Sequence, residues 1–238
     1  MKLPSPVKAE CVPRTLRWTA AGLGLAAGAY AAYAAVAWLR YGHPTPVEPG
    51  EQDDLLDRFM PVYEVRTRHY IHVAAPAAIT FEAARDMDLL QSPVVRAIIR
   101  AREFVLGATP DERPRPPGLL AEVHALGWGV LAHVPDREVV VGAVTRPWEA
   151  NVTFRALAPD AFAAFDEPGY VKIIWTLRAD PIDADRSVFS TETRVVSTDA
   201  TARERFRRYW SIFSPGMIVI RWVSLGPLRA EAERRARS

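Results

Sequence analysis

The C-terminal segment constrains the fold of this chain more than any other part of it. From Asp199 to about Arg235 the sequence predicts one long amphipathic helix, and Ser197, Thr198 and Asp199 offer side-chain oxygens for its N-cap. Apolar residues recur at spacings of three and four along one face, at Ala202, Phe206, Tyr209, Phe213, Met217 and Ile220. Pro215-Gly216 interrupts this pattern, which predicts a kink. A helix this long needs a broad apolar surface to cover, so we expect the preceding residues to supply a sheet.

The other dominant feature is an apolar run near the N-terminus. Residues 18–39 contain no charged side chain, and as a helix they would be about 33 Å long, enough to cross a bilayer. Trp18 and Trp38 stand at the two ends of the run, where interfacial aromatic residues belong. The sequence therefore predicts a transmembrane helix over residues 18–40, preceded by a tail of residues 1–17.

The charges beside this run predict its orientation. Four basic residues precede it, and acidic residues follow Arg40. The positive-inside rule then places the N-terminus in the cytoplasm and the domain outside the cell membrane. A cleaved signal peptide is an alternative, because Ala35-Val36-Ala37 has the small-x-small pattern of a cleavage site. A buried helix of a soluble protein is a third.

Residues 41–60 are predicted to be a proline-rich linker. Pro44, Pro46 and Pro49 favour an extended chain, and residues 41–54 could reach about 40 Å, which would let the domain stand clear of the bilayer. The end of this segment, Asp54 to Met60, is expected to form one helical turn. The folded domain is then residues 61–238.

Hydrophobic alternation predicts the strands of this domain. They are expected over residues 63–73, 128–134, 138–146, 151–157, 170–178 and 187–196. Helices are expected over residues 77–86 and 93–106, with shorter helical segments over 119–126 and 159–165 and a proline-rich loop over 107–118. Short connections between the later strands favour an antiparallel meander, and one apolar face per strand predicts a core on a single side of the sheet. The fold class is α+β.

Four strings in this order resemble the START-like helix-grip superfamily, the group of polyketide cyclases/dehydrases and lipid-transport proteins. They are HYIHVAAPAAITFEAARDMD (69–88), VVVGAVTRPW (139–148), STETRVVSTDATARERFRRYW (190–210) and the PG of FSPGMIVIRW (213–222). The resemblance covers roughly residues 63–235. It implies a curved sheet wrapped round the long C-terminal helix, with a cavity between them for an apolar small molecule.

The predicted inward faces supply the candidate ligand-binding residues. They are His69, Val141, Thr145, Phe154, Trp175, Phe189, Thr191, Thr193, Phe206, Tyr209, Phe213 and Met217. Threonines in the middle of an apolar face leave hydroxyl groups that a ligand or water would have to meet. The alternative is that these threonines bond to each other across the strands and the core is solid.

The composition narrows the function further. A net charge of +2 argues against a dedicated nucleic-acid binder, and a single cysteine, Cys11, excludes an intrachain disulfide. His69 and His72 point to opposite faces of one strand, so they cannot chelate a metal together, and no metal site or cofactor motif is predicted.

We expect a membrane-tethered protein that binds or transfers an apolar, lipid-like or quinone-like molecule. One alternative is a cyclase- or dehydrase-like enzyme with His69 or a cavity Thr or Tyr as acid–base group. Another is an interaction module with a filled pocket. The oligomeric state is not predicted.

Overall fold

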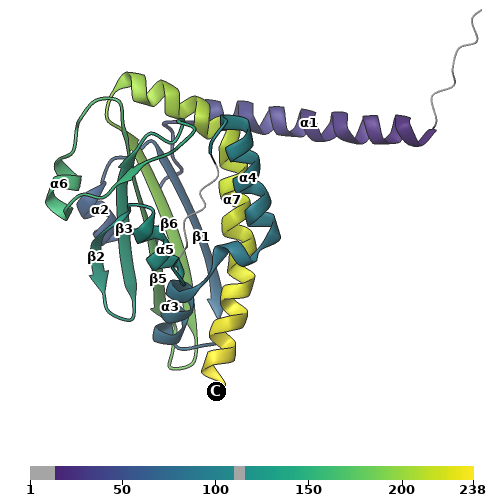
Figure 1. The fold of residues 1–238 in the computed structure, drawn as a ribbon. Coiled ribbons are helices and arrows are strands. Elements are labelled where there is room, and N and C mark those ends of the chain that lie inside the picture. Colours follow the sequence, from purple (N-terminus) through teal and green to yellow (C-terminus); the bar gives the residue numbers. More distant parts are fainter. Residues whose placement is uncertain (1–13, 110–115) are drawn as a thin grey trace, which may run out of the picture.

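The computed structural model describes residues 14–109 and 116–238, except for the side chains of residues 14–21 and 23. The N-terminal tail up to residue 13, with Cys11, and the middle of the predicted 107–118 loop lie outside the described residues. Within them, an antiparallel sheet packs against a long C-terminal helix, and an N-terminal helix projects from one end of the domain (Figure 1). The α+β prediction is confirmed.

The sheet of the described residues has six strands in the order β1-β6-β5-β3-β2, with β4 paired to β3, and every pairing is antiparallel. The strands are β1 (Val65–Val73), β2 (Gly129–Val134), β3 (Glu138–Thr145), β4 (Phe154–Arg155), β5 (Val171–Pro181) and β6 (Ser187–Ser197). Strands β2, β3, β5 and β6 follow the predicted meander, whereas β4 pairs only with β3 and lies off this path. β1 joins the far side of β6, which makes the first and last strands neighbours.

The helices come from the expected segments. They are α1 (Arg14–Arg40), α2 (Asp54–Phe59), α3 (Ala77–Asp86), the 3-10 turn η1 (Leu89–Gln91), α4 (Pro93–Leu106), α5 (Leu119–Ala125), α6 (Pro159–Ala164) and α7 (Ala200–Ala236). Their ends follow local chemistry. Asp199 caps α7 by accepting from the backbone nitrogen of Ala202 at 2.8 Å. Ser92 caps α4, and Gly107 ends it with a φ of 68°.

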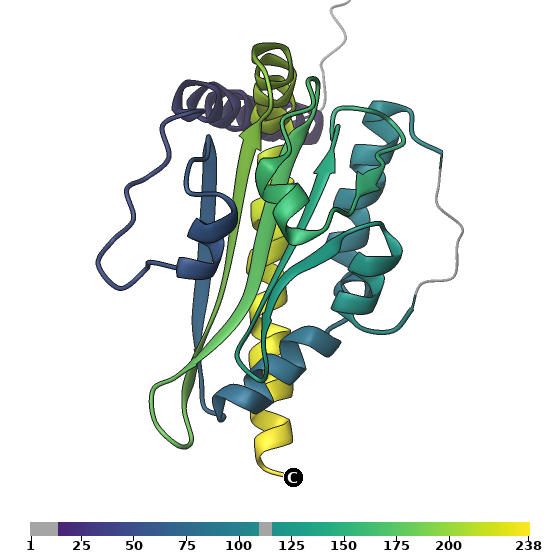
Figure 2. The ribbon, with the colours of Figure 1, turned by 90° about the vertical axis from the view of Figure 1, so that its left-hand side faces the viewer.

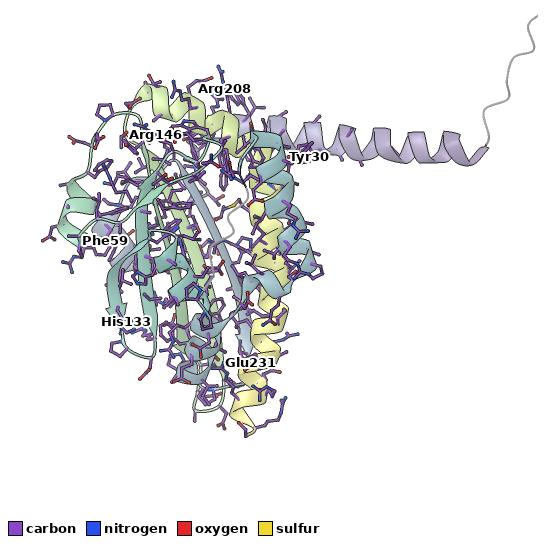
Figure 3. The ribbon with its side chains drawn as sticks, viewed as in Figure 1. Tyr30, Phe59, His133, Arg146, Arg208 and Glu231 are labelled. Atoms are coloured by element: carbon purple, nitrogen blue, oxygen red, sulfur yellow. The ribbon has the colours of Figure 1, made fainter. Side chains whose placement is uncertain are left out.

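Helix α7 is continuous but sharply bent (Figure 1). Its first part runs alongside α1, and its second part runs down the sheet beside α4. The bend lies after Arg208, which is in the first part (Figure 3). It lies no later than about Gly216, where a Cβ atom would be 2.8 Å from Ile98 of α4. Pro215 falls in this interval and cannot donate the backbone hydrogen bond of a straight helix, so the predicted kink is present.

The sheet is covered on both faces, whereas the sequence predicted a core on one. On the inner face lie α3 and α7, with α5 beside α3, and Figure 2 shows the sheet in front of α7. On the outer face, α2 and α6 bury Val140, Val144 and Ile174. The prediction of a single covered face was wrong because polar residues were expected to face water. On the outer face these polar residues are instead buried in ion pairs.

The predicted linker is part of this outer covering. Asp53, 5% exposed, caps α2, and Glu51 bonds Arg66 and Arg68 of β1 at 2.9 and 3.0 Å. The nitrogen of Gly42 donates to the carbonyl of Glu64. Residues 41–60 therefore lie against the domain and do not form an extended tether. The expected helical turn over Asp54–Met60 is confirmed as α2.

The strand predicted over residues 151–157 is shortened to the two residues of β4. Phe154 pairs with Thr145 there and packs on Trp128, with ring centroids 4.9 Å apart. Gly127, with a φ of 100°, approaches the Phe154 carbonyl so closely that a Cβ atom would collide with it. This contact turns the chain before a longer ladder can form.

Candidate functional site

The strand pairings place the predicted sheet residues on the inner face, toward α7. His69 of β1 is opposite Thr191 of β6, and Trp175 of β5 lies between Thr193 and Val141. Residues paired directly across strands share a face. The sequence therefore identified the inner face correctly, whereas the binding of a ligand by these residues stays a prediction.

Most of the large apolar residues of this set are packed into two clusters. One contains Val141, Trp175 and Phe189, with Leu225 and Leu228 of α7. The other is centred on Phe206, which is 2% exposed and packs with the residues Tyr41, Val65, Val171, Val195 and Tyr209. Phe213 stacks on Tyr209, with ring centroids 4.9 Å apart. Thr145 is satisfied locally, since its hydroxyl donates to the carbonyl of Thr153 at 2.8 Å.

The remaining polar residues meet an arginine that the sequence analysis did not select. Arg221 of α7 donates from Nη1 to Thr191 Oγ1 at 2.5 Å and from Nη2 to Thr193 Oγ1. His69 and Trp222 complete this Arg221 cluster, with their rings edge to face and centroids 6.2 Å apart. It lies on β1, β6 and α7.

The guanidinium of Arg221 has no carboxylate partner among the described residues. Burial lowers its pKa to about 10, which still leaves it protonated at neutral pH. A desolvated cation is normally paired, because removing a charge from water costs several kcal/mol, on the order of 5. The two threonine hydroxyls stabilise Arg221 but do not neutralise it.

His69 is the second polar group of the cluster that lacks a full set of partners. Its Nδ1 is buried and has no hydrogen-bond partner among the described residues. Burial lowers the pKa of His69, and the charge of Arg221 lowers it further. The imidazole is therefore neutral at pH 7 and offers one nitrogen as an acceptor or base.

The Arg221 cluster is not sealed by packed side chains. Protein atoms surround Arg221 densely, yet part of its side chain stays accessible, as does part of His69. Met217, one helical turn before Arg221, is 42% exposed. The cluster is therefore partly accessible from outside the fold.

A large groove of the described residues lies elsewhere. It has a volume of about 770 Å³ and is lined by α3, η1, the start of α4 and the last turns of α7, without any predicted ligand residue. Its charges are paired internally, because Arg235 bonds both Glu231 and Asp86, at 2.8 and 3.0 Å. The Arg221 cluster contains a cation without a described carboxylate partner and a histidine nitrogen without a described hydrogen-bond partner, so we take it as the candidate site. In the described residues no three His, Cys, Asp or Glu side chains are grouped to hold a metal ion.

No family model matches the chain, and no curated protein matches it. Among solved structures, the Zhui aromatase/cyclase from Streptomyces sp. R1128 is similar at 18% identity over 71% of this chain and 94% of that chain, with a TM-score of 0.25. A hypothetical protein from Helicobacter pylori is similar at 10% identity, over 79% of this chain and 98% of that chain, with a TM-score of 0.38. A protein from Chromobacterium violaceum is similar at 12% identity, over 71% of this chain and 96% of that chain, with a TM-score of 0.29. These similarities assign no activity.

Arg221 had a signal in the sequence. It is the one charged residue between Arg208 and Arg229, in an apolar stretch of helix α7. A charged side chain that is buried in an apolar stretch costs free energy unless it has a partner. A lone arginine there is therefore a candidate functional group. Helical periodicity hid the signal because it selects apolar residues for the inner face.

Proposed function

We propose that this protein binds or transfers an amphipathic molecule with an apolar body and an anionic head, and that it is anchored in a membrane by α1. The observation that supports this proposal most is the unpaired Arg221 guanidinium between the sheet and α7. An anionic head group supplies the missing counter-charge, and a guanidinium binds carboxylate or phosphate through two parallel hydrogen bonds. The apolar side chains on both sides of the cluster suit the rest of the ligand.

The membrane anchor is the second part of the proposal. Helix α1 carries exposed apolar side chains along most of its described length, among them Leu25 at 77% and Leu39 at 71%. Water is a poor solvent for such a surface, whereas lipid is a good one. The N-terminus would then be cytoplasmic and the domain extracytoplasmic, as the flanking charges predict.

The proposal is tested by native mass spectrometry of the full chain purified in detergent. Wild type should retain a small anionic apolar molecule, and Arg221→Met should lose most of it. Arg137→Met is the matched control, because Arg137 lies at the surface and pairs with Asp180 at 3.0 Å. Retention of no molecule by wild type, or equal retention by Arg221→Met, would contradict the assignment.

A second candidate function is supported by His69. A neutral imidazole beside a fixed cation can remove a proton from a ligand while the guanidinium holds the developing oxyanion. Under this cyclase- or dehydrase-like alternative, His69→Ala should retain an unreacted molecule whose mass differs from that retained by wild type. If both chains retain the same molecule, His69 has no acid–base role.

A further inference from the structure

The outward face of α7 is apolar where that of a soluble protein would be charged. Between Arg208 and Arg229 the only charged residue is Arg221, and it is turned inward to the sheet. Residues on the outward side remain uncovered, with Ile212 46%, Val219 40% and Trp222 66% exposed. Helix α7 also has the length and hydropathy expected of a membrane span, but its inner side packs on the sheet.

Helix α4 extends this apolar surface. Phe104 is 88% exposed and Val105 64%. Gly216 allows α4 to lie close to α7, since a larger residue there would meet Ile98. Exposed large apolar residues that form a continuous patch indicate a binding surface, whereas single ones do not. We call the outward residues of α7 and α4 the α4–α7 face.

The packing of α1 fixes where this face lies relative to a bilayer. The hydroxyl of Tyr30 donates to the carbonyl of Ile212, and Tyr33 lies 3.3 Å from the Ser214 hydroxyl. Nearer the end of α1, Arg207 donates to the Trp38 carbonyl at 3.0 Å and its guanidinium lies over the Trp38 ring at 4.1 Å. The residues around the bend of α7, from Arg207 to Ser214, therefore pack against the second half of α1.

These contacts determine how deep the bend of α7 lies in a bilayer that α1 spans. If α1 covers the hydrocarbon layer of about 30 Å, it needs the whole length from residue 18 to Trp38, at 1.5 Å per residue. Trp38 then lies at the interface, and Tyr30, eight residues earlier, lies about 12 Å inside it. Ile212, which Tyr30 contacts, must lie at a similar depth. The bend of α7 cannot stay in water while α1 spans.

We propose that the α4–α7 face is embedded in the same bilayer that α1 spans, with phospholipid as its occupant. The second part of α7 and α4 run down the side of the domain from which α1 projects (Figure 1), so they lie flat in one leaflet as interfacial helices do. Arg96 and Arg100 of α4 are exposed, and basic side chains of this kind suit lipid phosphates, although Arg96 also donates to the Gln91 carbonyl at 3.1 Å.

This arrangement deepens the proposed function and rests on α1 as the membrane anchor. Trp222 belongs to the α4–α7 face and also contacts His69 of the Arg221 cluster, at 6.2 Å between ring centroids. An amphipathic ligand would therefore enter from the acyl chains sideways, past Trp222, without crossing water.

Site-directed fluorescence in vesicles tests the embedding on the full chain. Cys11 is first replaced by serine, and single cysteines are then introduced in place of Phe104, Trp222 and Leu25 of α1. The control is a cysteine in place of Ile182, an apolar residue 47% exposed that directly follows β5. Each is labelled with an environment-sensitive dye and reconstituted in phosphatidylcholine–phosphatidylglycerol vesicles. Brominated lipids should quench the dyes at positions 104 and 222 about as strongly as the dye at position 25, and should leave position 182 unquenched.

Two results would overturn the embedding, and they differ in what they leave standing. Quenching at position 25 with none at 104 and 222 would mean that the domain stands clear of an inserted α1. No quenching at position 25 would remove the anchor itself. Neither result touches ligand binding by Arg221, which native mass spectrometry measures separately. In addition, Val219→Glu should lower quenching at position 104 severalfold, whereas Ile182→Glu should not change it.

Discussion

Two arginines, Arg194 and Arg221, lie on opposite faces of the sheet and have opposite surroundings. Arg194 on the outer face is 1% exposed and bonds Glu192 at 2.8 Å, Asp57 at 2.5 Å and the Met60 carbonyl at 3.0 Å. Burial by itself would lower the pKa of Arg194, but the two carboxylates raise it. Arg221 on the inner face has two hydroxyl partners and no described carboxylate.

We interpret the charges of the Arg194 network as stabilising the fold, and the charge of Arg221 as available to a ligand. The outer face holds a closed network in which Arg66 also bonds Glu51 and Glu192, each at 2.9 Å. Glu51, Glu192 and Asp57 each lie beside a cation, so the network holds α2 and residues 50–60 on the sheet, whereas Glu138 Oε1 is buried without a partner among the described residues. Arg221 on the inner face has no anion among the described residues, and this is why we propose it as a binding group.

Breaking the closed network should have the largest effect. Arg194→Met leaves Glu192, 3% exposed, without one of its cations, and we expect a loss of about 3–5 kcal/mol in the free energy of unfolding. Chemical denaturation of the full chain in detergent measures it. Arg137→Met breaks a surface pair and should cost less than about 1 kcal/mol. Similar losses for the two variants would mean that the outer network is not a structural element.

The outer network should also make stability depend on pH. Burial, together with the neighbouring Asp53 carboxylate, raises the pKa of Glu138 from 4.5 to about 8. The folded chain therefore holds a proton on Glu138 between these values that the unfolded chain releases, so the stabilisation from this group is full below pH 4.5 and is lost as pH rises to about 8. The fall should be on the order of 5 kcal/mol.

Glu138→Gln tests this cause. The variant should lose the fall in stability between pH 4.5 and 8 and should be more stable than wild type at pH 9. Denaturant titrations at several pH values measure both effects. Glu149→Gln, at an exposed glutamate, should keep the wild-type profile. An unchanged profile in Glu138→Gln would place the titrating group elsewhere.

The same substitution at Arg221 should behave unlike that at Arg194. Arg221→Met removes a desolvated charge and two hydrogen bonds, so the free energy of unfolding should change by less than about 1 kcal/mol, in either direction. Denaturation of ligand-free protein beside Arg194→Met measures the contrast. A loss near 3 kcal/mol would show that Arg221 is a structural residue, and the distinction between the two faces would fail.

The smallest effect is expected on the α4–α7 face. Phe104 is 88% exposed, so Phe104→Ala should change stability in detergent by no more than about 0.5 kcal/mol. On the same helix Val95 is 1% exposed, and Val95→Ala should cost about 1–3 kcal/mol. If Phe104→Ala destabilises the protein as much as Val95→Ala, then Phe104 packs against protein, and it is not free to meet lipid.

The sequence predicted the local elements well. The caps at Ser92 and Asp199, the hairpin turns and the inward set of β1, β3, β5 and β6 depend on neighbours within a few residues, so they can be read directly from the chain. The bend of α7 was predicted for the same reason, because a proline removes a hydrogen bond wherever it stands in a helix.

What the sequence missed depends on distant partners. The alternation of β1 and β6 marked Arg66, Glu192 and Arg194 as polar, but α2 and residues 50–60 bury them, and no pattern within a strand reveals that cover. The candidate site was predicted as apolar, with two threonines and a histidine. Its cation comes from α7, and only the bend and docking of that helix place Arg221 against Thr191 and Thr193.

The sequence by itself therefore determined the helices, the strands and the side of the sheet on which the long helix packs. Helices, strands and their inward faces follow from residue periodicity and end caps, which depend only on residues close together in the chain. Tertiary structure alone decided which charges are paired. Pairing depends on distances of 2.5–3.0 Å between side chains as far apart in the chain as Asp57 and Arg194, and burial makes the absence of a partner at Arg221 costly enough to mark the site.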